Sequence, residues 1–173
     1  MPEKNNKMRE PLIEKVTLNI GVGQAGDALE NAKTLLEKLS GSKAVPTSAK
    51  NRNPTFKIRK GDLIGAKTTL RGAQAGDFLK KAFEAANNRI SLRSIDTCGN
   101  FSFGIPEYIE FPGAKYDPVI GMLGFEVSVT MKRKGGFRVA KRRRNRSKIS
   151  KSHRLTQEEV VQFLQEKFNV KAE

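Results

Sequence analysis

Alternation of apolar and polar residues in three short segments constrains this chain more than any other feature. Residues 15–22 read KVTLNIGV, residues 63–71 read LIGAKTTLR, and residues 125–131 read FEVSVTM. Successive side chains of a strand point to opposite faces, so the apolar residues of each segment gather on one face. The pattern predicts three strands, and the first two have a polar outer face.

The polar face of the second strand follows a basic loop. Residues 47–61 read TSAKNRNPTFKIRKG, and no acidic residue occurs between Glu37 and Asp62. The outer face of the strand then carries Lys67, Thr69 and Arg71. Cations beside hydroxyl-bearing side chains suit a polyanion that has hydroxyl groups of its own. The loop and the strand together therefore suggest RNA.

The basic charge is concentrated in two segments. The chain has 33 Lys and Arg and 18 Asp and Glu, a net charge of +15. Residues 38–61 hold 7 basic and no acidic side chains, and residues 127–157 hold 12 basic and none acidic. The remaining 118 residues carry 14 basic and 18 acidic side chains. Such segregation favours binding to phosphate backbones over a merely solvated surface.

Helix signals separate the strands. Asp27 and Glu30 have capping-box spacing before a helix over residues 28–40, and Gly41 ends it. A short or edge strand is expected over residues 44–50, because Pro46 lacks the amide that a central strand needs. A second helix is expected to begin at Gly76 and Asp77.

The second half contains less regular patterns. Residues 90–95 are a possible strand, residues 99–105 form a strand with Phe101 and Phe103 on one face, and residues 106–118 are an irregular connection. The predicted organisation is one domain. It has a core over residues 1–131 whose first ten residues are a loose terminus, a basic extension over 132–154 that orders on its partner, and a C-terminal helix within 155–173, which Thr156 and Glu159 begin as a capping box.

Gly21, Gly23 and Gly26 spell GxGxxG between a predicted strand and a predicted helix. This is the context of a dinucleotide-binding turn, so a nucleotide-binding enzyme is one alternative. The acidic residue expected about 20 positions later is absent. A second alternative is a tight turn at positive φ. We favour a third, in which the glycines also let backbone amides approach an RNA phosphate.

Other features give little support for catalysis. Phe101 and Phe103 either stack on bases or pack in the core, and the core is favoured. The segment AKRRRN resembles a nuclear-import signal but is interpreted as phosphate contacts. The single Cys98 and single His153 cannot form a structural zinc site, and no cofactor is expected.

A soluble, cytoplasmic protein is expected, without membrane contact, because no apolar run is long enough to span a bilayer and no signal peptide is recognisable.

The segments KVTLNIGVGQAG, NPTFKIRKG, IGAKTTLRG and GNFSFGIPEYIEFPGAKYDP together resemble the universal 5S-rRNA-binding family of the large ribosomal subunit, large-subunit protein five. The resemblance runs from about Pro11 to Met131. The basic segment and the C-terminal helix are similar to the archaeal branch. The resemblance implies an α+β fold, a two-layer sandwich in which helices pack on one face of an antiparallel sheet.

The resemblance also implies partners. Family members attach 5S rRNA in the central protuberance of the large subunit, touch P-site tRNA, and form a bridge to a small-subunit head protein. Large-subunit rRNA and neighbouring large-subunit proteins are further expected partners. A general RNA chaperone is the remaining alternative.

Candidate site residues come from the resemblance and from the residue pattern. Asn19 and Thr69 match family 5S contacts, and Ser42 stands where the family often has Gln. The pattern adds Gly21, Gly23, Lys67 and Arg71. The loop that approaches tRNA in the family matches the segment containing Lys50, Arg52, Lys57, Arg59 and Lys60. The basic extension supplies contacts to rRNA and proteins: Lys132, Arg133, Lys134, Arg138, Lys141, Arg142, Arg143, Arg144 and Arg146.

Overall fold

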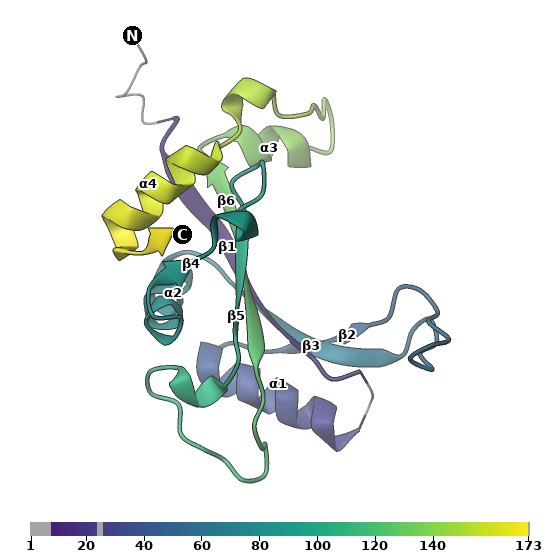
Figure 1. Cartoon of the computed structure of the whole chain (residues 1–173). Helices are drawn as coiled ribbons and strands as arrows, with labels where there is room; N and C mark the ends of the chain where they lie inside the picture. The colour runs from purple at the N-terminus through teal and green to yellow at the C-terminus, as the bar shows by residue number, and fades with distance from the viewer. Residues whose placement is uncertain (1–7, 24–25, 173) are drawn as a thin grey trace.

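One antiparallel sheet forms the frame of the molecule. The structure is a computed structural model that describes residues 8–23 and 26–172. Five strands lie in the order β2–β3–β1–β6–β5. They are β1 (Pro11–Gly21), β2 (Val45–Ser48), β3 (Leu63–Leu70), β5 (Phe101–Ile105) and β6 (Phe125–Arg133). In Figure 1, β2 and β3 diverge to one side of the long strands. The alternation-based strands are confirmed, and Pro46 lies in an edge strand, as predicted.

Three helices share a hydrophobic core with the sheet. They are α1 (Asp27–Ser40), α2 (Ala73–Ala85) and α4 (Gln157–Phe168). Helix α1 contacts β3, whereas α2 and α4 contact β1. The short helix α3 (Gly136–Lys141) follows β6 and lies at the opposite end of the long strands from α1 (Figure 1). The predicted α+β fold, with an antiparallel sheet and packed helices, is confirmed.

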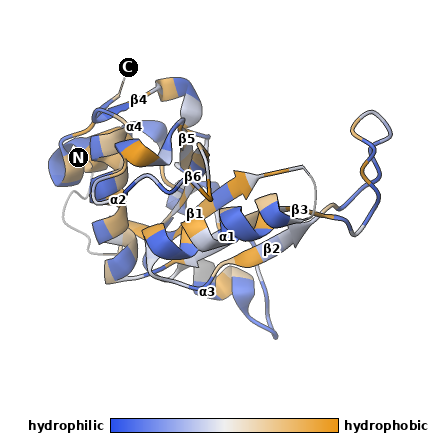
Figure 2. Ribbon diagram, turned by 90° about the horizontal axis from the view of Figure 1, so that it is seen from below, coloured by the Kyte–Doolittle hydropathy of each residue, from blue (hydrophilic) through white to orange (hydrophobic). Residues whose placement is uncertain are grey.

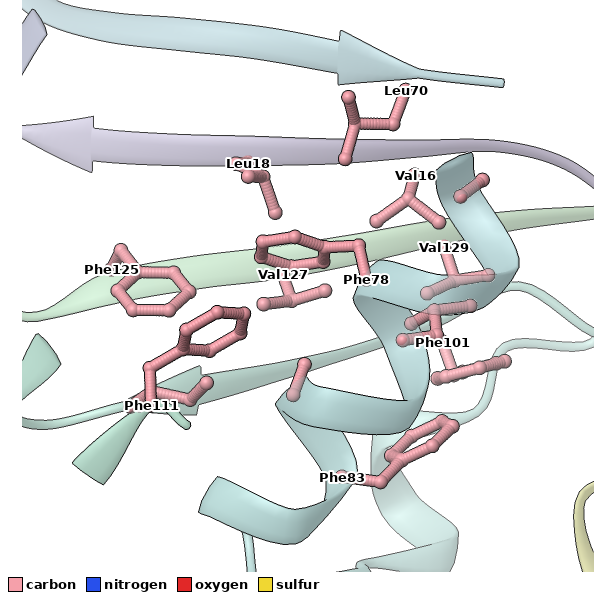
Figure 3. Close-up of a cluster of buried hydrophobic side chains, with 14 of the residues drawn as sticks. Val16, Leu18, Leu70, Phe78, Phe83, Phe101, Phe111, Phe125, Val127 and Val129 are labelled. Atoms are coloured by element: carbon pink, nitrogen blue, oxygen red, sulfur yellow. The ribbon is translucent and has the colours of Figure 1, made fainter. Parts of the chain in front are cut away.

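The covered face of the sheet is apolar because the strand period brings its large side chains together. Figure 3 shows side chains of β1, β3, β5 and β6 facing the two phenylalanines of α2, Phe78 and Phe83. Leu18 and Val127 are fully buried, and each buried side chain of this size contributes about 1.5–3 kcal/mol. Ring stacking also joins α2 to the connection after β5, since the Phe78 and Phe111 centroids are 4.9 Å apart. This packing fixes which strand residues remain on the opposite face.

Two helix starts differ from the prediction. The capping box at Asp27 and Glu30 is wrong, because the N-cap of α1 is Gly26 and no side chain caps the helix. The Gly26 φ of 123° is a conformation that a residue with a Cβ rarely adopts. Helix α2 begins at Ala73, earlier than the predicted Gly76, because the chain turns sharply at Gly72 with φ 65°. The sequence pattern marked the helices correctly but not the glycine turns that start them.

The possible strand over residues 90–95 is wrong for most of its length. Only Arg89–Ile90 (β4) forms a strand there, and it pairs in parallel with Lys171–Ala172 (β7) near the C-terminus, whereas Ile95 makes an isolated bridge to Phe101. A 3-10 helix over Leu92–Ser94 follows, and the Ser91 hydroxyl accepts a hydrogen bond from the Arg93 amide at its start. This local bond satisfies the Arg93 amide within the turn, in place of a strand hydrogen bond.

The core does not end at Met131, which corrects the predicted organisation. Leu155, Val160 and Leu164 belong to the same buried cluster as the sheet. A Cβ added at Gly99 would lie 2.8 Å from the Val160 side chain, so the backbone before β5 approaches α4 closely. The predicted capping box of Thr156 and Glu159 is confirmed. The C-terminal helix is thus part of the core.

Candidate RNA interface

The face of the sheet opposite the helices carries small polar side chains in register. Asn19 on β1 pairs with Lys67 on β3 and with Glu126 on β6. One row away, Thr17 pairs with Thr69 on one side and with Ser128 on the other. Directly paired residues project from the same face. We call this surface, made of the outward residues of β1, β3, β5 and β6, the open face.

The open face brings together most of the predicted 5S rRNA contacts. Asn19 and Lys67 are direct cross-strand neighbours, Thr69 lies one row away, and Arg71 follows the end of β3. Lys67 and Arg71 are exposed. Ser42 lies apart from them, in the turn between α1 and β2, where the Thr68 hydroxyl donates to the Lys43 carbonyl at 3.2 Å. The structure thus groups amide, hydroxyl and cationic side chains on one rigid surface.

The glycine turn after β1 is structural. The amides of Val22 and Gly23 both donate to the Ile64 carbonyl, at 2.9 and 2.8 Å. Gly23 has φ 83°, so the tight-turn alternative is confirmed. The favoured interpretation, in which these amides hold an RNA phosphate, is wrong for Gly23 because its N–H is already bonded. Residues 24–25 of the motif lie outside the described residues.

The basic loop between β2 and β3 projects away from the body, as Figures 1 and 2 both show. Backbone bonds between Ala49 and Asp62 and between Asn53 and Ile58 hold the loop together. Between them, Phe56 is 71% exposed. The predicted tRNA-contacting cations are all exposed: Lys50, Arg52, Lys57, Arg59 and Lys60.

Phe56 was not among the RNA-contacting residues predicted from the sequence, although an aromatic residue inside a polar loop was a signal for such a role. An exposed aromatic ring among cations is a suitable surface for stacking on a base. Phe101 and Phe103 are not available for that purpose. They lie 6.3 and 5.3 Å from Phe83, centroid to centroid, which confirms their predicted place in the core.

Arg133 does not belong to the RNA-contacting extension. It continues the inward series of β6, its side chain is 4% exposed, and its Nη2 donates to Glu159 Oε1 at 2.7 Å. The period-two pattern from Phe125 onward was a signal for this, since Arg133 occupies the next inward position. Its guanidinium is therefore committed to α4.

The other cations of the extension lie on the surface. Lys132 is half-buried on the open face, opposite Leu12 of β1. Lys134 is 3.8 Å from a Glu10 carboxylate oxygen, and Lys141 is 2.7 Å from one of Glu14. Exposed arginines follow: Arg138, Arg142, Arg143, Arg144 and Arg146. The segment is partly ordered within the chain, because it includes helix α3 and a 3-10 helix over Lys151–His153.

The irregular connection after β5 exposes apolar side chains. Ile109 is 39%, Tyr116 56%, Val119 77% and Met122 51% exposed. Tyr108 is buried instead, and its hydroxyl accepts a hydrogen bond from the Asp117 amide at 2.9 Å. The connection is thus a folded loop that exposes several apolar side chains, which suit a protein partner.

Asp117 fixes this loop to α1. The Lys38 ammonium group donates to its carboxylate at 2.7 Å. That bond lowers the pKa of Asp117 below its ordinary value, and the bond from the Val119 amide lowers it further. Asn31 on α1 adds a bond to the Val119 carbonyl at 2.9 Å.

The described residues offer neither a metal site nor a membrane span. No group of three or more His, Cys, Asp or Glu residues there is placed to hold a metal ion. No helix in residues 8–23 and 26–172 is long and apolar enough to cross a bilayer.

Comparison with known proteins gives a consistent result along the chain. A family model described as "Ribosomal protein L5" matches residues 6–59, and the model for the C-terminus of the same ribosomal family matches residues 63–163. A "Large ribosomal subunit protein uL5" from Sulfurisphaera tokodaii is 49% identical over 166 residues, covering 95% of this chain and 93% of the relative. Proteins of the same name from Methanococcus maripaludis and Picrophilus torridus are each 47% identical, and cover 94% and 99% of this chain and 91% and 97% of their own lengths.

Proposed function

The chain belongs to the ribosomal protein L5 family of structural large-subunit proteins, and from this premise we propose that it binds 5S rRNA and attaches it in the central protuberance. The relatives are ribosomal proteins and not enzymes, and Gly23 is already used by the fold, so the nucleotide-enzyme alternative has no support. RNA binding and a role in translation follow from the family.

The open face is the observation that carries the 5S rRNA proposal. Asn19, Lys67 and Thr69 lie side by side on it, supported from behind by a fully buried layer that includes Leu18. Small hydrogen-bonding side chains in fixed positions suit sugars and base edges, and the adjacent cations suit phosphates. Glu126 is the exception on this face, since its carboxylate repels a phosphate group.

The projecting loop fits a contact with P-site tRNA. It reaches beyond the body of the protein (Figure 2) and presents cations that attract any phosphate backbone without reading its sequence. A ligand that must leave in every elongation cycle is better served by weak contacts of this kind. Phe56 adds a surface on which a base or ribose can pack.

The apolar loop after β5 fits the bridge to a small-subunit head protein. Its exposed Val119 and Tyr116 match a protein surface better than a phosphate backbone. The exposed arginines beyond α3 fit rRNA, and the acidic partners Glu10 and Glu14 fix only the beginning of that segment. Each surface therefore has its own proposed partner.

A pair of double variants tests the division between the two RNA surfaces. Asn19→Ala with Thr69→Ala is expected to weaken binding of isolated 5S rRNA by at least tenfold. Lys57→Ala with Arg59→Ala is expected to change it about twofold or less, although it removes two charges. Binding is measured by filter retention at fixed ionic strength, with an unrelated RNA of equal length as the control. A larger loss from the loop pair would contradict the assignment, and equal affinity for the unrelated RNA would indicate a general RNA chaperone.

A further inference from the structure

A hollow of about 460 Å³ lies at one end of the open face, beside the Asn19 row. It is an open surface depression and not an enclosed cavity. Backbone and small side chains from β1, β5 and β6 and their connections form most of its lining, which includes Asn19, Gly21, Gly104, Pro106, Gly124 and Glu126. The 5S rRNA contacts proposed above do not explain why the face is hollowed here.

Two glycines near this hollow are required by the fold. A Cβ on Gly65 would lie 2.5 Å from the Ile20 carbonyl oxygen, and one on Gly124 would lie 2.6 Å from that of Pro106. A Cβ atom does not approach a carbonyl oxygen so closely, so these positions exclude every larger residue. Packing within the chain accounts for them completely.

Gly21 and Gly104 have no such explanation. A Cβ on either residue would meet nothing within 4 Å, and neither has a positive φ. Glycine also weakens a strand, by about 0.5–1 kcal/mol relative to alanine. A strand glycine that the fold does not need often marks the close approach of a ligand. Gly104 pairs directly with Glu126, so the vacant space is adjacent to that carboxylate.

Glu126 determines what kind of group can enter. Its side chain is exposed, and Asn19 Nδ2 donates to its Oε2 at 3.4 Å. A carboxylate accepts hydrogen bonds and repels phosphates, so its ligand must offer N–H or O–H donors. The glycines beside it leave room for a flat group to lie against the backbone. The neighbouring Lys67 and Arg71 still provide for phosphates on either side of that group.

We propose that the hollow holds one unstacked guanine of the bound RNA, read by Glu126. Among the four RNA bases, only guanine presents two adjacent donors, N1–H and N2–H, on its Watson–Crick edge. These match the two oxygens of a carboxylate in a charge-assisted pair. Asn19 has a second N–H for the guanine O6. Unstacked bases read on their edges are the usual basis of sequence-specific RNA recognition. The inference rests on the proposed function and specifies one contact within it.

The charge of Glu126 gives a test in which the two explanations predict opposite signs. If Glu126 is a bystander, Glu126→Gln removes repulsion and 5S rRNA binds equally well or more tightly. If it reads guanine, the same change weakens binding about tenfold, as expected for loss of a bidentate contact. Glu84→Gln, an equal change in charge on α2 away from the open face, is the control and is expected to have no effect.

Gly104→Val tests the hollow independently of charge. Valine favours strands, and a Cβ at this position meets nothing within 4 Å, so the melting temperature is expected to stay the same or rise. The side chain would occupy the part of the hollow beside Glu126, so 5S rRNA affinity is expected to fall about tenfold or more. Gly76→Ala, which also adds a carbon atom where nothing lies within 4 Å, is the matched control. Wild-type affinity for Gly104→Val would overturn the proposal.

Inosine interference identifies the base. Inosine lacks the N2 amino group, so 5S rRNA with inosine at the critical guanine is expected to bind the wild type weakly. The same RNA should bind Glu126→Gln no worse than unmodified RNA does. Interference at no guanine, or at one that both proteins require equally, would overturn the guanine site while leaving 5S binding intact. Failure of the wild type to prefer 5S rRNA over an unrelated RNA would instead overturn the proposed function, and this inference with it.

Discussion

The open face and the projecting loop are both polar surfaces of one chain, yet they differ in how their side chains are held. Thr17, Asn19 and Thr69 lie on strands whose reverse side is fully buried, so their positions are fixed to the backbone. The loop cations are long, exposed side chains on a segment that extends away from the body. Hydrogen bonds to base edges require fixed donors and acceptors, whereas attraction to phosphate does not. One surface is therefore suited to a permanent RNA partner and the other to an exchanging one.

The largest expected effect comes from removing the support of the open face. A chain that ends after Arg154 lacks α4 and β7 and exposes their sites on the core. Val160, Phe163 and Leu164 alone account for about 5–9 kcal/mol of burial, comparable with the whole stability of a typical domain. We expect this chain to lose its cooperative urea transition and its 5S rRNA binding.

Replacing the loop is the matched comparison for that truncation. Substituting Gly and Ser for residues 52–59 removes no buried side chain except part of Ile58, which is only partly buried. The urea midpoint is expected to remain close to that of the wild type, with 5S rRNA binding retained. A truncated chain that unfolds as cooperatively as the wild type would show that α4 and β7 contribute no more to stability than the loop does.

Glu159→Gln is expected to have the next largest effect, because it leaves the Arg133 charge buried without its partner. Glutamine preserves the capping role of Glu159 at the start of α4. Loss of one partner of a buried pair costs about 3–5 kcal/mol. Glu159 is 39% exposed, so solvent screening reduces the expected loss to about 1–3 kcal/mol. Urea denaturation measures the loss, and a midpoint equal to that of the wild type would contradict the buried pair.

Arg133→Met separates the structural role of this arginine from an RNA role. The remaining carboxylate is partly hydrated, so the loss of stability is expected to be smaller than for Glu159→Gln. The salt dependence of 5S rRNA binding should not change. A lower slope of log affinity against log salt, of the kind expected for removing a phosphate contact, would return Arg133 to the RNA-contacting set.

The loop variant Lys57→Ala with Arg59→Ala is expected to produce a smaller effect, restricted to tRNA. Removal of two phosphate contacts should weaken tRNA binding several-fold and reduce its log–log salt slope by roughly one to two. Stability should change by less than about 0.5 kcal/mol, as for most surface substitutions. Filter binding over a salt series measures both quantities, and an unchanged tRNA slope would contradict the role of the loop.

The sequence predicted where the polar surfaces lie better than it predicted which residues belong to them. Alternation in residues 15–22 and 63–71 identified the strands and their polar faces, because a period of two depends only on backbone geometry. The same period, continued two residues beyond Met131, puts Arg133 on the inward face, but the surrounding basic residues led to its assignment to an extension that orders on its partner. Which cation is buried depends on a carboxylate 26 residues away, and no local pattern reveals that partner.

The open-face hollow and the short sheet of β4 and β7 show the same limit. Gly21 and Gly104 are 83 positions apart, and their proximity follows from β1 and β5 both flanking β6. The pairing of Ile90 with Ala172 joins segments that have no periodic signal of their own. Pairing between distant segments therefore determines structural features that the pattern within one segment does not predict.

The smallest predicted effect concerns the Asp117–Lys38 pair, which joins the apolar loop to α1. Because the folded-state pKa of Asp117 is lowered, the carboxylate contributes stability above its unfolded pKa and loses it as the pH falls through the folded value. Asp117→Asn should therefore have a slightly lower melting temperature than the wild type above about pH 5. The difference should shrink as the pH falls below about 3.8, the ordinary value of the group. Lys33→Met, which removes the partly buried cation of a pair within α1, is the control and should not reproduce the pH dependence. A difference that persisted unchanged in acid would mean that the substituted amide disturbs the loop by its shape, and that the ion pair does not stabilise this surface as the strands stabilise the open face.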